Sequence, residues 1–186
     1  PDRRVCRDAG PATPTRERLS SEPQNRTSAR TLVPMPTIHF HLETDLAPAV
    51  VMAGLTDFGA SRTEVWPNVD QENFKLHGSG PGWAEVTEGS SIAGGVWERE
   101  RYTWDGAAGT VAVETLESNT WGEGSRWDYR LVPVGGGTRI DVTVVRNPLN
   151  VKAQLIAFGL AIFGRSMLRT QMAQALARIA ASNVGR

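Results

Sequence analysis

The chain has 186 residues, of which 40% are hydrophobic and 22% are charged, and its formal net charge at pH 7 is zero. This length corresponds to one ordinary domain with some excess. No apolar run reaches the roughly 18 residues that a membrane span requires, so we expect no integral membrane contact. The balanced charge predicts no nucleic-acid partner. The single cysteine, Cys6, excludes an intramolecular disulfide and a cysteine-based zinc site.

The N-terminal segment differs in composition from the rest of the chain. Residues 1–34 contain seven arginines against four acidic residues, a net charge of +3, and five prolines. Such a segment cannot bury enough apolar surface to offset its ordering entropy, so we predict a disordered leader over 1–35 and a folded domain over 36–183. It lacks the apolar core of a secretory signal, and we predict a cytoplasmic location. Met35 is a candidate start, which would make the leader an upstream extension.

The folded part begins with a strand and two short helices. Residues 37–45 alternate between apolar and polar side chains, which predicts a half-buried strand. Pro48 suits the first turn of a helix over 49–55. A second helix over 61–66 begins at a candidate N-cap, Ser61, and ends before a proline.

Three hairpins follow, and their residue pairs can be counted outward from turns at 135–136, 107–108 and 78–82. Apolar residues face each other on one side: Leu131–Ile140, Tyr129–Val142, Trp127–Val144, Trp104–Val111, Tyr102–Val113, Phe74–Val86 and Leu76–Ala84. Opposite charges pair on the other side: Arg130–Asp141, Arg101–Glu114 and Lys75–Glu85. A one-residue slip would destroy both features, so with the first strand we predict a seven-stranded antiparallel sheet.

A long helical pattern closes the chain. It begins at Asn147, a candidate N-cap, and runs to about Ser182. At 1.5 Å per residue it would be about 50 Å long, so we expect a kink or break at Gly159 or Gly164. Its second half carries one apolar stripe, formed by Leu168, Met172, Leu176 and Ile179. Its first half, over 153–164, is apolar on nearly all sides.

This order of elements resembles the helix-grip fold of the START-like (SRPBCC) superfamily, in particular bacterial polyketide cyclase/dehydrase-type proteins. The local strings that carry the resemblance are Trp66-Pro67, residues 96–104, 116–119 and 124–127, and residues 135–139 leading to Arg146. The resemblance implies an α+β domain in which a curved seven-stranded antiparallel sheet wraps around the C-terminal helix and leaves an apolar cavity. It also implies binding of lipids, sterols, polyketides or similar molecules. It carries over no catalytic residue, because the superfamily has no universal catalytic motif.

The candidate ligand-binding residues are those that this fold would turn inward. They are Phe40, Leu42, Phe74, Leu76, Tyr102, Trp104, Val113, Trp127, Tyr129 and Val142 from the sheet, Phe158 or Phe163 from the long helix, and Phe58 and Trp66 at the mouth. Large rings with a polar tip suit a pocket that orients an apolar ligand by one or two hydrogen bonds. The alternative is a filled core without a cavity.

Two carboxylates interrupt the apolar face of one strand. Glu98 and Glu100 share this face with Tyr102 in the predicted register. Desolvation raises the pKa of a carboxyl group, which can then act as a general acid or base. Glu100 with Tyr102 is therefore the candidate catalytic pair. The alternatives are a bulge that turns both glutamates outward, or a position at a wet rim.

We expect no metal site and no cofactor. His39 and His41 share a strand face, but no third ligand is identifiable, and no phosphate loop, nucleotide fingerprint or Ser/His/Asp set is present. The apolar segment 153–164 has three interpretations: a roof over the cavity, a homodimer interface, or a membrane-surface contact, for which it lacks a flanking basic cluster.

The sequence therefore favours a protein that binds a hydrophobic small molecule. The first alternative is a cofactor-independent enzyme of the polyketide cyclase/aromatase type. The second is a protein-interaction module that acts through the outer face of the sheet, where arginines and acidic residues are mixed.

Overall fold

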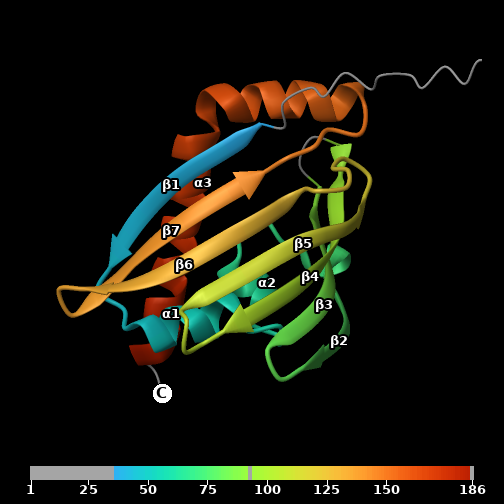
Figure 1. The fold of residues 1–186 in the computed structure, drawn as a ribbon. Helices are drawn as coiled ribbons and strands as arrows, with labels where there is room; N and C mark the ends of the chain where they lie inside the picture. The colour runs from blue at the N-terminus through green and yellow to red at the C-terminus, as the bar shows by residue number, and fades with distance from the viewer. Residues whose placement is uncertain (1–35, 92–93, 185–186) are drawn as a thin grey trace, which may run out of the picture. The chain divides into compact units, whose positions relative to one another are not determined.

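A computed structural model describes residues 36–91 and 94–184 (Figure 1). The strands are β1 (Thr37–Thr44), β2 (Lys75–Gly80), β3 (Trp83–Ser90), β4 (Val96–Asp105), β5 (Thr110–Ser118), β6 (Arg126–Val134) and β7 (Gly137–Val145). The helices are α1 (Pro48–Leu55), α2 (Arg62–Val65) and α3 (Val151–Val184), with a 3₁₀ turn, η1, at Gln71–Asn73. The predicted leader over 1–35 lies outside the described residues.

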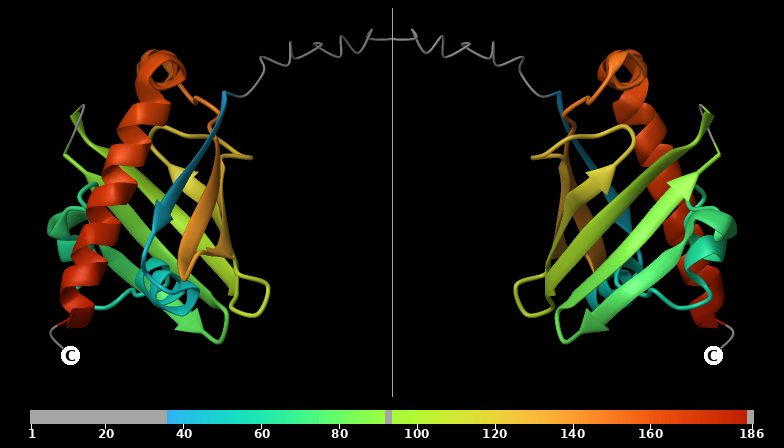
Figure 2. Two further views of the ribbon diagram at one scale, coloured as in Figure 1. Left: turned by 90° about the vertical axis from the view of Figure 1, so that its left-hand side faces the viewer. Right: turned by 90° about the vertical axis from the view of Figure 1, so that its right-hand side faces the viewer.

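The seven strands form one antiparallel sheet in the order β1-β7-β6-β5-β4-β3-β2. The two-residue alternation of the strands puts one face of the sheet inside and leaves the other exposed. The sheet curves, and α3 and the short helices lie on its inner side (Figures 1 and 2). Fully buried side chains from the sheet and α1 form the core: Val51, Val86, Val111, Val113, Ile140 and Val144. The predicted helix-grip architecture is confirmed.

Two of the three predicted hairpin registers are confirmed, and the third is wrong. Tyr129 pairs with Val142, and Tyr102 pairs with Val113, as predicted. In the β2–β3 hairpin, however, Leu76 pairs with Val86 and not with Ala84.

The β2–β3 error has two physical causes. The strand continues through Gly80, so the turn lies at Pro81-Gly82, where Gly82 has φ +76°. In addition, a bulge between Leu76 and Gly78 places an extra residue in β2. Lys75 consequently pairs with Thr87, and Phe74 lies before the strand.

The long helix begins later than predicted, and of the predicted kink or break it shows a kink without a break. Asn150, and not Asn147, caps it: its side-chain oxygen accepts a hydrogen bond from the Ala153 backbone N–H at 2.9 Å. Pro148 instead forms an isolated β-bridge with Trp121. The helix is continuous from Val151 to Val184, and it changes direction between its two halves (Figures 1 and 2).

The two halves of α3 differ in burial. Leu168, Met172, Leu176 and Ile179 are buried against the sheet and the short helices, as the predicted stripe required. In the first half, most large apolar side chains face solvent. By length and composition alone, Val151–Asn183 would suffice to cross a bilayer, although the sequence contains no uninterrupted apolar run of that length.

Candidate functional site

A cavity of about 260 Å³ lies between the inner face of the sheet and α3. Aromatic, acidic and basic side chains line it together with aliphatic residues. Its aromatic and charged lining consists of Phe40, Trp66, Tyr102, Trp121, Trp127, Tyr129, Arg62, Arg146, Glu88, Glu98 and Glu100. The predicted cavity is therefore present, and it holds more ionisable groups than a purely apolar pocket would.

Arg62 is buried on α2, and each of its three guanidinium nitrogens donates a hydrogen bond. Its Nε donates to Glu88 Oε1 at 2.6 Å, and its Nη2 donates to the Tyr102 hydroxyl at 2.9 Å. Its Nη1 donates to the Leu55 carbonyl at 3.1 Å. The guanidinium lies 4.9 Å from the ring centroids of Phe58 and Trp66. These rings exclude water from the ion pair while their faces stabilise the cation.

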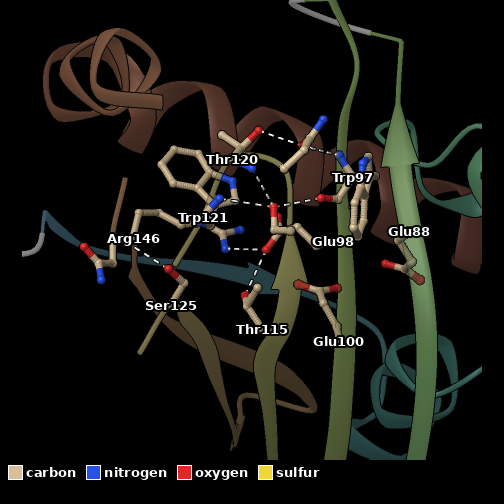
Figure 3. Close-up of polar contacts among 12 residues, drawn as sticks. Glu88, Trp97, Glu98, Glu100, Thr115, Thr120, Trp121, Ser125 and Arg146 are labelled. Atoms are coloured by element: carbon tan, nitrogen blue, oxygen red, sulfur yellow. Dashed lines mark hydrogen bonds and ion pairs between the residues drawn. The ribbon is translucent and has the colours of Figure 1, made fainter. Parts of the chain in front are cut away.

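Arg146, just after the end of β7, forms a second pair of the same kind. Its Nη1 donates to Glu98 Oε2 at 2.9 Å (Figure 3). The guanidinium lies over the indole rings of both Trp121 and Trp127, at 5.2 and 4.8 Å from their centroids. The Thr115 hydroxyl donates to the same Glu98 oxygen at 2.9 Å. Both arginines are thus neutralised by a glutamate and held by aromatic rings.

Glu100 lies between these two pairs without a cation of its own. Its side chain is buried. The Tyr102 hydroxyl, which has one proton to donate, lies 3.1 Å from Glu88 Oε2 and 3.4 Å from Glu100 Oε2, so Glu100 has the longer contact. Glu98 on β4 and Glu88 on β3 project on the same side of the sheet (Figure 3). Burial, followed by the charges of Glu98 and Glu88, raises the pKa of Glu100 well above 4.5. This environment favours the neutral carboxyl, which presents an O–H donor.

Two further donors border the cavity. Among the residues that the structure describes, Trp66 Nε1 is the buried side-chain polar atom without a hydrogen-bond partner. The Tyr129 hydroxyl makes no hydrogen bond within the same residues, and burial raises its pKa above the ordinary value, so it keeps its proton. An unpaired buried N–H is costly, and a ligand that accepts from it would remove this cost.

The structure separates the predicted ligand-binding residues into three groups. Phe40, Trp66, Tyr102, Trp127 and Tyr129 line the cavity. Others belong to the core without lining it: Leu42, Phe58, Val113 and Val142 are buried, and Phe74 and Trp104 are half-buried. The remaining three are corrected: Leu76 is 42% exposed, Phe158 68% and Phe163 69%.

These corrections have identifiable causes. Leu76 lies on β2, the edge strand that the bulge displaces. Phe158 and Phe163 lie on the half of α3 that is apolar all round, where periodicity cannot distinguish the inner side from the outer.

Glu98 and Glu100 both face inward, as the predicted register required. A bulge is present, but it lies in the partner strand: Arg99 pairs with Glu117 and Glu100 with Thr115, so Leu116 is the extra residue. The alternation of β4 therefore continues through Glu100 and Tyr102, which are both buried and both line the cavity.

Sequence reasoning missed Arg62, Glu88 and Arg146 as site residues. Glu88 carried a usable signal, because it continues the buried face of Ala84 and Val86 on β3. Arg146 follows the last core positions of β7 in the same way. The sequence around Arg62 gave no signal of burial, because a four-residue helix is too short for periodicity to show which side is buried.

No metal site is found among residues 36–91 and 94–184, where no three His, Cys, Asp or Glu side chains gather for an ion. His39 donates to or accepts from the Thr143 hydroxyl at 3.0 Å on the outer face.

Solved structures resemble this arrangement over most of the chain. A START superfamily protein from Mycobacterium smegmatis is 13% identical, with a TM-score of 0.62 over 77% of this chain and 97% of its own. The ZhuI aromatase/cyclase from Streptomyces sp. R1128 is 18% identical, with a TM-score of 0.57 over 79% of this chain and 90% of its own. The chain has the START-like helix-grip fold.

A third solved structure of similar fold is norcoclaurine synthase from Thalictrum flavum in complex with dopamine and hydroxybenzaldehyde. It is 14% identical, with a TM-score of 0.55 over 80% of this chain and 87% of its own. No protein-family model matches the chain, and no curated protein matches it. At these identities the START-like likeness establishes the fold, and the ligand has to be argued from the cavity residues.

Proposed function

We propose that this protein binds an uncharged hydrophobic molecule that carries a hydrogen-bond acceptor, such as an aromatic ketone, in the cavity between the sheet and α3. The observation that carries the proposal is a set of polar groups on the aromatic wall of the cavity. The Trp66 indole N–H and the Tyr129 hydroxyl have no protein acceptor, and the one contact of the Glu100 carboxyl, to the Tyr102 hydroxyl, is 3.4 Å long. Small-molecule sites typically combine apolar walls with a few convergent polar groups.

The charges in the cavity argue for a neutral ligand. Arg62 and Arg146 are each paired with a glutamate within hydrogen-bond distance, so neither is free for a carboxylate or phosphate. A ligand anion would also lie near the carboxylates of Glu88 and Glu98 without a countercharge of its own. Burying an unpaired charge costs far more than burying a carbonyl that accepts hydrogen bonds.

The test compares two ligands of matched shape, 2-acetylnaphthalene and 2-ethylnaphthalene, by quenching of tryptophan fluorescence. We expect the ketone to bind roughly tenfold more tightly, the equivalent of about one buried hydrogen bond. Trp66→Phe should narrow this preference, and Trp83→Phe, which changes an indole on the outer face beside Arg101, should not. Equal affinity for the two naphthalenes, or binding of neither, would overturn the proposal.

A second candidate function is cofactor-independent acid catalysis of the cyclase or dehydratase type. The observation that favours it is the position of Glu100 inside the cavity. Its carboxyl lies 3.4 Å from the Tyr102 hydroxyl, and burial favours the protonated form. Glu100 could donate a proton to a ligand carbonyl and recover it later in the cycle.

Glu100→Gln separates binding from catalysis. The amide keeps a donor and the shape of the side chain, so the affinity for 2-acetylnaphthalene should change little. An enzyme would lose at least about a hundredfold in turnover of its substrate. Turnover that survives Glu100→Gln would exclude Glu100 as the acid and leave the binding function standing.

A further inference from the structure

The first half of α3 presents an apolar face to solvent. The α3 apolar face consists of large side chains that are each at least 45% exposed: Val151, Leu155, Phe158, Ile162, Phe163 and Met167. Val151, Leu155, Phe158 and Ile162 follow one another at spacings of four, three and four residues, which aligns them in one stripe. A contiguous exposed patch of this kind marks an interaction site.

The charges along α3 are all positive. The helix contains Lys152, Arg165, Arg169 and Arg178 and no acidic residue. Arg165 and Arg169 continue the stripe beyond Ile162, and both are exposed. Within the described part of the chain, neither forms an ion pair or a side-chain hydrogen bond. The face is therefore an apolar stripe that ends in two free guanidinium groups, which suit phosphate oxygens.

The α3 apolar face also borders the cavity. Met167 is 45% exposed and lines the cavity at the same time, and Ile156 and Leu160, on the inner side of the same half-helix, line it too. The α3 apolar face is thus continuous with a wall of the cavity. The relevance of this continuity to a ligand rests on the proposed function, whereas the charge argument does not.

We propose that the α3 apolar face lies on an anionic membrane surface, with Leu155, Phe158 and Ile162 inserted among the acyl chains and Arg165 and Arg169 at the lipid phosphates. A second copy of the chain is a poorer occupant, because pairing two such helices would bring cations together without an acidic residue on either. An interfacial helix has this combination of an apolar face and basic residues. The sequence has no flanking basic cluster, but Arg165 and Arg169 follow the apolar segment and lie on the same side of the helix as its exposed stripe.

The helix lies on the membrane and does not cross it, even though it is long and apolar enough to do so. Leu168, Met172 and Ile179 in its second half are buried in the domain core. A transmembrane position would require this second half to leave the sheet and expose the core. The free energy lost by exposing these core side chains would exceed the free energy gained by inserting the first half into the membrane.

The experiment is flotation of the full chain with vesicles of phosphatidylcholine, with and without about one third phosphatidylglycerol. We expect binding that requires the anionic lipid and weakens with salt. The double variant Leu155→Ser/Phe158→Ser should lower the partition coefficient at least about tenfold. Arg165→Gln and Arg169→Gln should each lower it about fivefold.

The matched control is Leu76→Ser/Leu116→Ser, which removes two exposed apolar side chains from the sheet, 42% and 46% exposed, and should bind as the unchanged chain does. Circular dichroism verifies that each variant is folded.

Absence of binding to both kinds of vesicle, or binding by the Leu155→Ser/Phe158→Ser variant equal to that of the wild-type chain, overturns the proposal. A concentration-dependent dimer in sedimentation that this variant abolishes, without vesicle binding, would assign the face to a second copy. Loss of vesicle binding leaves the naphthalene assay unaffected, so the two proposals fail separately.

Discussion

The side chain of Glu100 shows how one residue is controlled by its neighbours. The two arginines in the cavity are already paired with Glu88 and Glu98, so their positive charges are largely compensated and lower the pKa of Glu100 only weakly. Burial is then the dominant influence on its pKa, and the two neighbouring carboxylates act in the same direction. A cavity with two cations and three acids therefore contains one carboxyl in an environment that favours retention of its proton.

Glu100→Gln should change the pH dependence of stability. Below about pH 4.5 the carboxyl is protonated in both the folded and the unfolded chain. Above it the unfolded chain releases the proton and the folded protein retains it, so the free energy of unfolding falls by about 1.4 kcal/mol per pH unit until the folded pKa is reached. Glutamine does not titrate, so the variant does not undergo this fall in the free energy of unfolding. Urea unfolding between pH 5 and 8 should show the variant gaining stability relative to the unchanged chain as pH rises. Parallel curves would contradict the raised pKa, and Glu72→Gln, at an exposed position, is the control.

Arg62 is the residue whose removal should be most damaging. Arg62→Met leaves Glu88 buried without its cation, at a cost of about 3–5 kcal/mol. Arg62→Met/Glu88→Gln should recover a large part of this loss, because no unpaired charge remains. Arg126→Met breaks the exposed pair with Asp128 and should cost less than about 1 kcal/mol. Unfolding in urea measures all three variants. A double variant no more stable than Arg62→Met would show that packing, and not the unpaired charge, sets the cost.

The predictability of these residues depended on the element that carries them. The inward position of Glu100 followed from alternation along β4, which a bulge in β5 left intact. Glu98 and Tyr102 followed from the same alternation. The partner of each glutamate could not be predicted, because Arg62 approaches from a separate helix and the contact spans 26 residues of sequence. Pairing across elements is a property of the fold and leaves no local pattern.

At the scale of elements, α3 shows that periodicity works only where a helix has a polar side. Its second half carries polar residues opposite Leu168 and Met172, and the buried face was predicted correctly. Its first half has almost none, and the prediction for Phe158 and Phe163 was wrong. The predicted register of the edge hairpin β2–β3 was wrong for a related reason. Its glycines allow the turn at several positions, and the bulge after Leu76 shifts the register further.

Two glycines of α3 provide an internal comparison. A Cβ at Gly159 would meet nothing within 4 Å, so Gly159→Ala should stabilise the protein by about 0.5–1 kcal/mol through helix propensity. A Cβ at Gly164 would lie 2.9 Å from Ile38 Cδ1, so Gly164→Ala should be less stable than Gly159→Ala. Thermal unfolding of both variants measures the difference. A destabilising effect of Gly159→Ala would show that the helix is not continuous at that point.

At the scale of the whole molecule, the fold could be predicted because many weak signals agreed. One-sided alternation in seven strands, two well-determined hairpins and a long terminal helix allow few other architectures. The contents of the cavity were less predictable, because they depend on where the curvature of the sheet and the change of direction in α3 leave space.

The pairing of β1 with β7 has a consequence for synthesis on the ribosome. His39 and Thr143 are neighbours in the sheet but are 104 residues apart in the chain. The first strand is therefore translated long before its partner strand exists. Until β7 has been made, β1 has no strand to pair with, and the apolar side chains around Phe40 stay exposed. The β4–β5 and β6–β7 hairpins, whose strands are adjacent in sequence, can form early. Closure of β1 onto β7 then carries the largest loop entropy and comes late, so the N-terminal strand is the last part of the sheet to become protected from misassembly.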